Sequence, residues 1–351
     1  MSFSNTFDTT NTGSAVSNRE DLTDVLTILA PEETPVLSSA SKQKASATFA
    51  EWTVDELASP ITTGIDEGAD VSTFTDKFAG RARLGNYIQK FRRDYMVSDL
   101  QDAVDSVGPA KIAQAEAKAI RELKRDVEAT IIGTGDASIE NGQGTPYKMR
   151  GLSKWIQTGA QTDSAPATPE NYRPDAGQIH DIGDEGAFTE TTLNSLISTI
   201  YRHTGSTQNL TLVADTGLRK TISNFARFGT TVPALDASSN SQASFDPSIR
   251  SVNYDGNSAL IKLSVEIYES DFGRVSIVNM NPDTAPATIA NSAQTDFNDG
   301  FLLNPEYYGI HDLIPMGSTR LPNLGGGERG YVDCSLTLGV YHPQAHGKIT
   351  Q

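Results

Sequence analysis

The five histidines offer the most accessible chemistry in this sequence, because a neutral imidazole binds zinc or moves a proton near neutral pH. They are His180, His203, His311, His342 and His346. No two of them form the helical pair with an intervening acid that a zinc protease requires. His342 and His346 have helical spacing, but Pro343 and Gly347 would interrupt a helix there. We therefore expect a solvated C-terminal tail at this place and no metal site.

The glycine-rich stretches and the nucleophilic residues also lack the patterns of known catalytic loops. Gly133-Thr-Gly135 has no third glycine at dinucleotide-fold spacing, and residues 325–327 precede an expected strand, which indicates a turn. Neither a Gly-x-Ser-x-Gly elbow nor triad-like spacing supports a hydrolase, the enzymatic alternative. Cys334 lies in an alternating apolar pattern that favours a core position. We predict no enzyme, no catalytic residue, no bound cofactor and no metal.

The charge balance excludes one class of partner. The 351 residues include 28 Lys and Arg against 44 Asp and Glu, a formal net charge of -16. Proteins bind DNA, RNA and anionic lipid by neutralising phosphates with clustered Lys and Arg, so we do not expect a nucleic-acid reader. Residues 77–125 nevertheless hold 11 of the basic residues against six acidic ones, so this segment carries +5 and the rest carries -21. We interpret it as a solvated face that meets acidic surface, including the acidic residues 1–41 of another copy.

The cysteine content and the hydropathy pattern restrict where such a chain functions. One cysteine allows no intramolecular disulfide and no thiolate cluster, which indicates synthesis in a reducing compartment. Residues 1–13 are polar and do not resemble a secretion signal. The sequence also has no run of about 20 apolar residues, the length that a membrane-spanning helix needs.

The first half of the chain predicts an arm, a hairpin and a long helix. Residues 1–41 are polar, with a short amphipathic helix expected at 18–29 and extended backbone at 34–37 around Pro35. Residues 42–97 predict a projecting hairpin of two long strands with an acidic turn at 64–70. A helix of about 24 residues should begin near Pro109 and end at Gly133, since apolar residues recur there at helical spacing. These are Ala115, Ala119, Leu123, Val127 and Ile131.

The second half predicts a mixed body. Residues 134–187 are polar and indicate a long surface loop, followed by a helix from the N-cap Thr189 to Gly205. A strand at 210–214, a helix at 216–228, a loop at 232–251 and a hairpin turning at 271–273 follow. The last expected strand, 334–340, alternates between an apolar face and a polar one. The fold class is α+β, one body with two projections.

This order of parts resembles the major capsid proteins of tailed bacteriophages, and most closely the podophage-type head proteins. Thr-Pro-Val at 34–36, Ala-Glu-Trp-Thr-Val-Asp at 50–55 and Glu67-Gly68 resemble that family's passage from arm to hairpin. Asp-Tyr-Met-Val-Ser at 94–98 is similar to its return into the long helix. The stretch 268–278 resembles its axial hairpin, and 336–345 its closing strand.

The resemblance implies a division of the chain and a function. Residues 1–41 would be the N-terminal arm, 42–97 the E-loop, 98–188 the spine helix and first part of the peripheral (P) domain with a long loop insertion, 189–312 the axial (A) domain, and 313–351 the P-domain return strands and C-terminus. The chain would assemble as hexamers and pentamers into an icosahedral head that encloses double-stranded DNA without reading its sequence. It would be part of the virion, assembled in the host bacterial cytoplasm.

The resemblance also implies partners and leaves alternatives. Some relatives carry a fused scaffolding domain, whereas only about 30 residues precede Pro31 here, so assembly would need a separate scaffolding protein or none. A portal and a decoration protein are the other implied partners. An encapsulin-like compartment shell, which encloses enzymes, is the main alternative, and an acidic adhesin or glycan-binding module is a weaker one because no secretion signal is visible.

Overall fold

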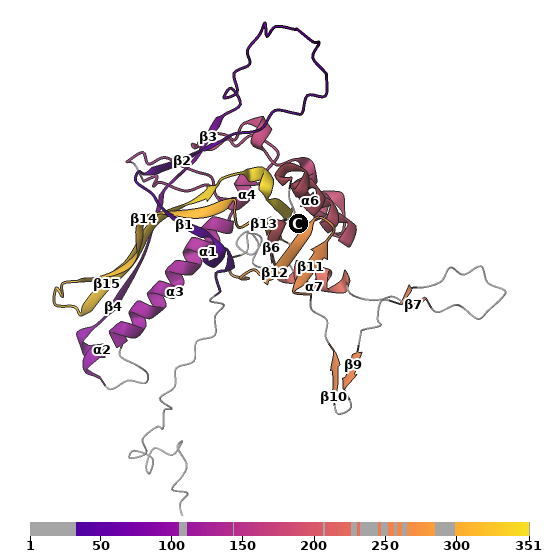
Figure 1. The fold of residues 1–351 in the computed structure, drawn as a ribbon. Helices are drawn as coiled ribbons and strands as arrows, with labels where there is room; N and C mark the ends of the chain where they lie inside the picture. Colours follow the sequence, from indigo (N-terminus) through magenta and orange to yellow (C-terminus); the bar gives the residue numbers. More distant parts are fainter. Residues whose placement is uncertain are drawn as a thin grey trace, which may run out of the picture.

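The computed structural model describes residues 33–104, 111–142, 144–205, 208–225, 230–231, 245–246, 252–255, 258–261, 265–284 and 299–350. These residues form two lobes with two hydrophobic clusters, and the loop 55–81 projects from them (Figure 1). Mixed sheets with segregated helices confirm the α+β class. The expected helix at 18–29 lies outside the described residues, as does most of the loop expected at 232–251.

The first lobe is a helix on a four-stranded sheet. Its strand order is β1 (Ser41–Lys44), β14 (Tyr308–Leu321), β15 (Glu328–Val340) and β4 (Gln89–Val97). β14 and β15 form a long antiparallel ribbon, with β1 parallel to β14 and β4 antiparallel to β15. The β14 ladder shifts register between Asp312 and Gly317, which is where Pro315 lacks an N–H to donate.

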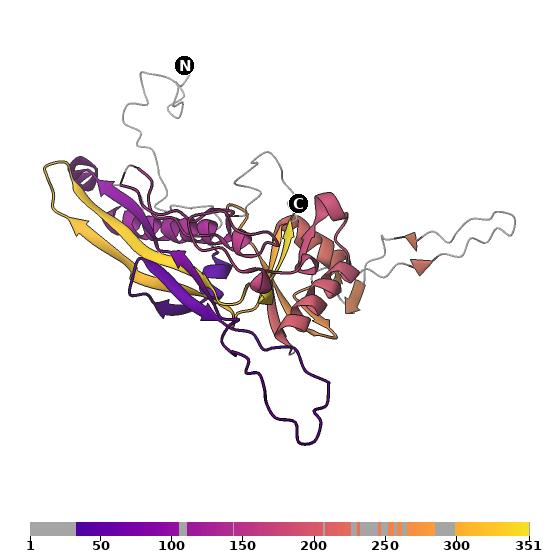
Figure 2. The ribbon, with the colours of Figure 1, turned by 90° about the horizontal axis from the view of Figure 1, so that it is seen from above.

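Helix α3 (Lys111–Ile132) lies along this sheet, as Figures 1 and 2 show. Ala119, Leu123, Val127 and Ile131 are all buried, which confirms the apolar ladder expected from the sequence. Gly133 follows the last turn, as predicted. Ordinary helices have about three turns, and this one is twice as long because the extended sheet gives its apolar stripe a surface along the whole length.

The second lobe is a six-stranded mixed sheet in the order β11 (Ile267–Ser270), β12 (Gly273–Asn279), β6 (Gln208–Ala214), β13 (Gly300–Leu303), β16 (Gly347–Thr350) and β5 (Ile179–Asp181). Helices α6 (Glu190–Thr204) and α7 (Thr216–Phe225) pack on it (Figure 2). The Thr189 hydroxyl accepts from the N–H of Thr192 at 3.3 Å, and Gly205 ends α6 with φ +69°. Both helix signals and the turn at 271–273 are confirmed.

The hairpin prediction was correct only at its base. β2 (Phe49–Val54) pairs with β3 (Ala82–Tyr87), but residues 55–81 between them form a long loop without helix or strand. This part of the sequence has Thr, Gly, Ser and acids without strict alternation, so no extended ladder forms. After Ile88 the chain continues as β4 into the sheet of the first lobe.

The remaining elements are short. They are α1 (Pro35–Ser39), α2 (Asp99–Ala103), α4 (Leu152–Trp155), α5 (Ile182–Glu185), β7 (Thr230–Thr231), β8 (Phe245–Asp246), β9 (Val252–Asp255), β10 (Ser258–Ile261) and the 3-10 turns η1 (Glu170–Tyr172), η2 (Ala176–Gln178) and η3 (Pro343–Ala345). Helix α1 corrects the extended backbone expected at 34–37: Pro35 occupies the first helical position, where its missing N–H costs nothing.

Three segments are more buried than their sequences indicate. The expected surface loop 134–187 contributes Trp155 and Tyr172 to the main core. The expected solvated tail ends in β16, an inner strand of the six-stranded sheet. The polar face of β15 is also covered, because Ser335 and Thr337 are buried beneath a second layer. In each case the local composition predicts exposure, but another part of the chain packs over the segment and buries it.

Candidate functional site: an exposed loop on a buried base

The loop 55–81 presents apolar side chains to solvent. Leu57 is 98% exposed and Phe74 is 90% exposed. The full set of large apolar side chains exposed on this loop is Leu57, Ile61, Ile65, Val71, Phe74 and Phe78. Burial of one such side chain is worth about 1.5–3 kcal/mol, so a folded single chain leaves a large favourable term unused here. The arrangement suits contact with another protein surface.

The two ends of this loop are clamped to the body. The Arg81 Nε donates to Asp55 Oδ2 at 2.7 Å, and this bond lowers the pKa of the Asp55 carboxyl. The Tyr172 hydroxyl donates to the carbonyl of Gly80 at 2.7 Å. The Asn171 amide donates to Glu56 at 3.2 Å. The loop therefore begins and ends at fixed points on residues 170–172, while its middle projects (Figure 1).

An aromatic cluster holds strand β2 at the base of the loop. Trp52 lies 5.7 Å from Trp155, 5.8 Å from His311 and 6.0 Å from Tyr341, measured between ring centroids. The His311 and Tyr341 rings meet edge to face. Burial lowers the pKa of His311, so its ring is neutral where it stacks on Trp52. Aromatic packing of this kind adds about 0.5–1.5 kcal/mol per pair beyond area burial.

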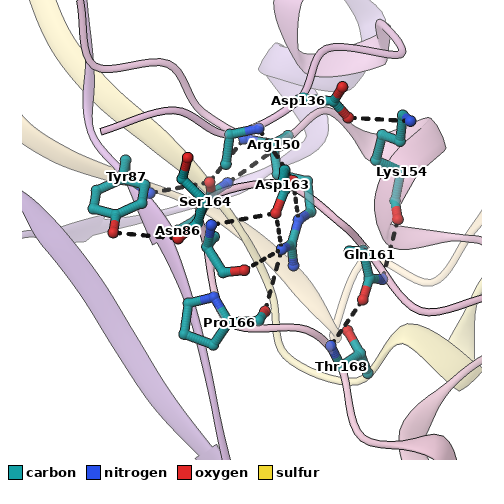
Figure 3. A network of polar contacts seen from close by, with 12 residues as sticks. Asn86, Tyr87, Asp136, Arg150, Lys154, Gln161, Asp163, Ser164, Pro166 and Thr168 are labelled. Carbon is teal, nitrogen blue, oxygen red and sulfur yellow. Dashed lines mark hydrogen bonds and ion pairs between the residues drawn. The ribbon is translucent and has the colours of Figure 1, made fainter. Parts of the chain in front are cut away.

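The buried side-chain amide of Asn86 on β3 joins three segments of the chain, and Figure 3 shows it beside Arg150. The Asn86 Nδ2 donates to the carbonyl of Leu338 at 2.9 Å and to that of Arg150 at 3.2 Å. Its Oδ1 accepts from the backbone N–H of Arg150 at 2.8 Å. One side chain thus ties the loop base to β15 and to residue 150.

Arg150 and Asp163 form a fully buried ion pair beside this amide (Figure 3). The Arg150 Nε donates to Asp163 Oδ2 at 2.8 Å, and the guanidinium lies 4.6 Å over the ring of Trp155. Burial is the largest single influence and would raise the pKa of Asp163, but the hydrogen bonds and charge of Arg150 together with the backbone N–H groups of Ala137 and Ala165 outweigh it, and the pKa is lowered. Neither residue was predicted from the sequence, because both lie in a polar segment. The nearby apolar residues Met149, Leu152 and Trp155 were the available signal.

The arm is seated on α3 by a second buried carboxylate. Glu128 Oε1 accepts from the N–H of Val36 at 2.9 Å, and Oε2 accepts from the N–H of Leu37 at 2.8 Å. The Ser39 hydroxyl bonds to the Tyr308 hydroxyl at 2.7 Å, and Asn281 donates to the Glu33 carbonyl at 2.9 Å. Residues 33–44 are therefore anchored on their own chain.

The basic segment 77–125 finds part of its charge balance within the chain. Arg93 forms two hydrogen bonds with Asp126, at 2.6 and 2.7 Å. Lys90 pairs with Asp333 at 3.1 Å, and Arg125 pairs with Asp283. Acidic residues of the same chain therefore provide part of the acidic surface that this basic face was expected to contact. How much of it also meets another copy stays a prediction.

The residues considered for enzymatic chemistry are dispersed. His180 contacts Glu185 at 2.8 Å, and His203 contacts Asp175 at 2.9 Å. His342 lies against Tyr172, and His346 is fully buried, where desolvation lowers its pKa to about 4. Burial also raises the pKa of the Cys334 thiol to about 12, which fits the expected core position. Among the described residues, no group of three His, Cys, Asp or Glu could hold a metal ion.

Two further features have structural roles. Residues 325–327 form the connection between β14 and β15, with φ +94° at Gly325 and +125° at Gly327, which fits the expected turn. In the part of the chain that the structure describes, no helix combines the length and apolar character that a membrane crossing requires.

Comparison with known proteins gives a consistent result. A family model described as SU10 major capsid protein matches residues 4–351. The fold is similar to the capsid structure of cyanophage P-SCSP1u, with a TM-score of 0.58 and 14% identity, covering 97% of this chain and 95% of that one. It is similar to the capsid of the native GTA particle, with a TM-score of 0.56 and 14% identity, covering 97% of this chain and 96% of that one. It is also similar to a structure from Mycobacterium phage Bobi, with a TM-score of 0.55 and 11% identity, covering 95% of each chain. No curated protein matches the sequence.

Proposed function

The chain belongs to the SU10 major capsid protein family, and from this premise we propose how its parts build a shell. It is a structural subunit of a phage particle, one of many copies, and not an enzyme. The family match thus favours the phage head over the encapsulin-like shell and the adhesin. The finer assignments below are proposals.

The exposed apolar loop carries the proposal. Residues 55–81 project from a rigid base while six large apolar side chains stay in solvent. We propose that this loop is the E-loop and lies over a neighbouring subunit in the shell. Several weak contacts of this kind act together when each subunit has several neighbours, since linked binding events add avidity.

We propose the division into arm, E-loop, spine helix, P-domain and A-domain with boundaries amended by strand pairing. β1 and β4, at the ends of the segment 41–97, pair with β14 and β15 and so belong with the P-domain sheet. β5 and β16 pair with the sheet of the second lobe and so belong with the A-domain. α3 is the spine helix.

We propose that the second lobes meet in hexamers and pentamers, and that the resulting icosahedral head encloses double-stranded DNA without sequence-specific binding. The net charge of -16 supports containment without adsorption, because a negative wall repels phosphates. A separate scaffolding protein, a portal and a decoration protein are proposed partners, and the host bacterial cytoplasm is the proposed place of assembly.

The test is assembly of the purified full chain, followed by sedimentation velocity and negative-stain electron microscopy, with and without co-expressed scaffolding protein. We expect capsomers or shells from the wild type. The variant Leu57→Ser/Ile61→Ser/Phe74→Ser should remain a folded subunit and lose assembly. A matched variant at three exposed polar residues of the same loop, Thr62→Ser/Thr63→Ser/Thr75→Ser, should assemble. Two results would contradict the proposal. One is a wild type that stays monomeric under every condition, and the other is normal assembly of the triple variant Leu57→Ser/Ile61→Ser/Phe74→Ser.

A further inference from the structure

Helix α1 has no cap of its own. The side chain of its N-cap residue, Thr34, accepts no hydrogen bond, and Pro35 at the first position has no N–H. The next two amides, those of Val36 and Leu37, donate to the two carboxylate oxygens of Glu128 on α3. Glu128, which is far away in the chain, therefore caps α1. The first N–H groups of α1 have hydrogen-bond acceptors only while the arm is docked on α3.

The Glu128 carboxylate is buried without a cation. Its side chain is fully covered, and its hydrogen bonds come from two uncharged backbone amides. The charged groups on the same helix are directed elsewhere: Arg125 pairs with Asp283, Asp126 pairs with Arg93, and Lys124 is exposed. α1 has no charged residue.

Among the described residues, the other buried titratable group at this seat does not change charge near neutral pH, and Glu33 at the start of the segment is exposed. Tyr308 of β14 bonds to Ser39 of the arm, and burial, together with the nearby Glu128 charge, raises the pKa of its hydroxyl above the ordinary value of 10.0. On β1, Lys42 and Lys44 are exposed. The charge of Glu128 is therefore the one that changes at the buried contact between the arm and the described part of α3.

We propose that Glu128 makes docking of the arm segment 33–40 on the spine helix a proton-linked equilibrium, in which acidification tightens docking and rising pH loosens it. The physical reason is that docking covers the carboxylate. An undocked arm leaves Glu128 in water, where it ionises freely, whereas the docked arm encloses it where a charge is costly.

The direction and size of this pH dependence follow from the pKa of Glu128 in the docked state and in the undocked state. Burial raises the pKa of Glu128 from the ordinary 4.5 to about 7, and the two amide bonds offset only part of this rise. A carboxyl with a raised pKa binds a proton on docking between these values, so the proton-linked contribution to docking is fully present below pH 4.5 and is lost as pH rises through 7. Between pH 5.5 and pH 8 the docking constant should fall roughly thirtyfold.

Hydrogen–deuterium exchange of the full-length chain tests this inference. The amides of residues 36–40 are followed from pH 5.5 to pH 8, and their rates are corrected for the intrinsic pH dependence of exchange. We expect protection of these amides to fall by roughly thirtyfold over this range in the wild type. In Glu128→Gln the protection should be weaker, because the amide side chain keeps one carbonyl acceptor, and independent of pH.

Glu122→Gln is the matched control. It is the same change on the same helix at a half-buried residue that pairs with Lys118. The hydrogen bonds of the described arm residues 33–40 to α3 go to Glu128 and not to this residue, so the variant should keep the wild-type slope. A wild type whose arm protection is flat or rises with pH overturns the proposal, whether or not any variant folds. Equal slopes in the wild type and Glu128→Gln would also overturn it. None of these results depends on shell assembly, so the failure of this inference is distinguishable from the failure of the proposed function.

Discussion

The base of the hairpin buries polar side chains, whereas the tip of the same hairpin exposes apolar ones. At the base, Asn86 is fully buried and each described polar group of its side chain has a partner. At the tip, Leu57 and Phe74 are almost fully exposed. The base is thus completed by its own chain, whereas the tip is not. A chain can therefore stabilise the point from which a projection starts while the apolar side chains of the projection stay exposed; in the proposed function, neighbouring subunits cover them.

The largest expected effect comes from breaking the buried ion pair at the base. Arg150→Met leaves Asp163 buried without its cation and should lower the free energy of unfolding by about 3–5 kcal/mol. Urea denaturation of the subunit, followed by Trp52 and Trp155 fluorescence, measures it. The double variant Arg150→Met/Asp163→Asn removes the stranded charge and should recover part of the loss. A double variant less stable than the single one would show that the pair acts in another way.

Truncation of a core side chain in β3 should have the next largest effect. Leu84 is fully buried opposite Trp52 in the β2–β3 ladder. Leu84→Ala should reduce the free energy of unfolding by about 2–5 kcal/mol, through lost burial and the cavity left behind. Thermal and urea unfolding measure the change. A loss below about 1 kcal/mol would mean that the base is not packed as a core.

Removal of one clamp at the end of the loop should cost less. Tyr172→Phe deletes the hydroxyl that donates to Gly80 and should destabilise the subunit by about 1 kcal/mol, the typical net value of one hydrogen bond. Exchange of the amides at 78–82 should increase in this variant while exchange in α3 stays unchanged. Equal increases in both regions would indicate global unfolding and would contradict a local clamp.

The smallest effect on the subunit should come from the tip. Leu57→Ala is the same chemical change as Leu84→Ala in the same hairpin, but it should alter subunit stability by less than about 0.5 kcal/mol. Its effect should instead be a higher protein concentration for assembly, measured by light scattering. If Leu57→Ala destabilised the free subunit as much as Leu84→Ala, the contrast between base and tip would be wrong.

The segments that form the candidate site could be predicted from the sequence, but the roles of its buried polar residues could not. The arm, the projection and the long helix could be inferred because proline, turn composition and apolar spacing are local signals. The roles of Arg150, Asp163 and Glu128 could not be inferred, because each depends on which distant segment covers it. His346 shows the same limit: the local sequence indicates a tail, whereas the pairing of β16 with β13 buries the ring.

The α3 ladder, the caps of α6, the turn between β11 and β12, and the acidic net charge follow from the amino-acid sequence, because each depends on residues within a few turns or on a simple count. Only tertiary packing buries part of the segment 134–187 in the core, covers both faces of residues 334–340 of β15, and places Glu128 of α3 as the cap of α1. Burial of a polar group is a property of the layer above it, and that layer comes from elsewhere in the chain.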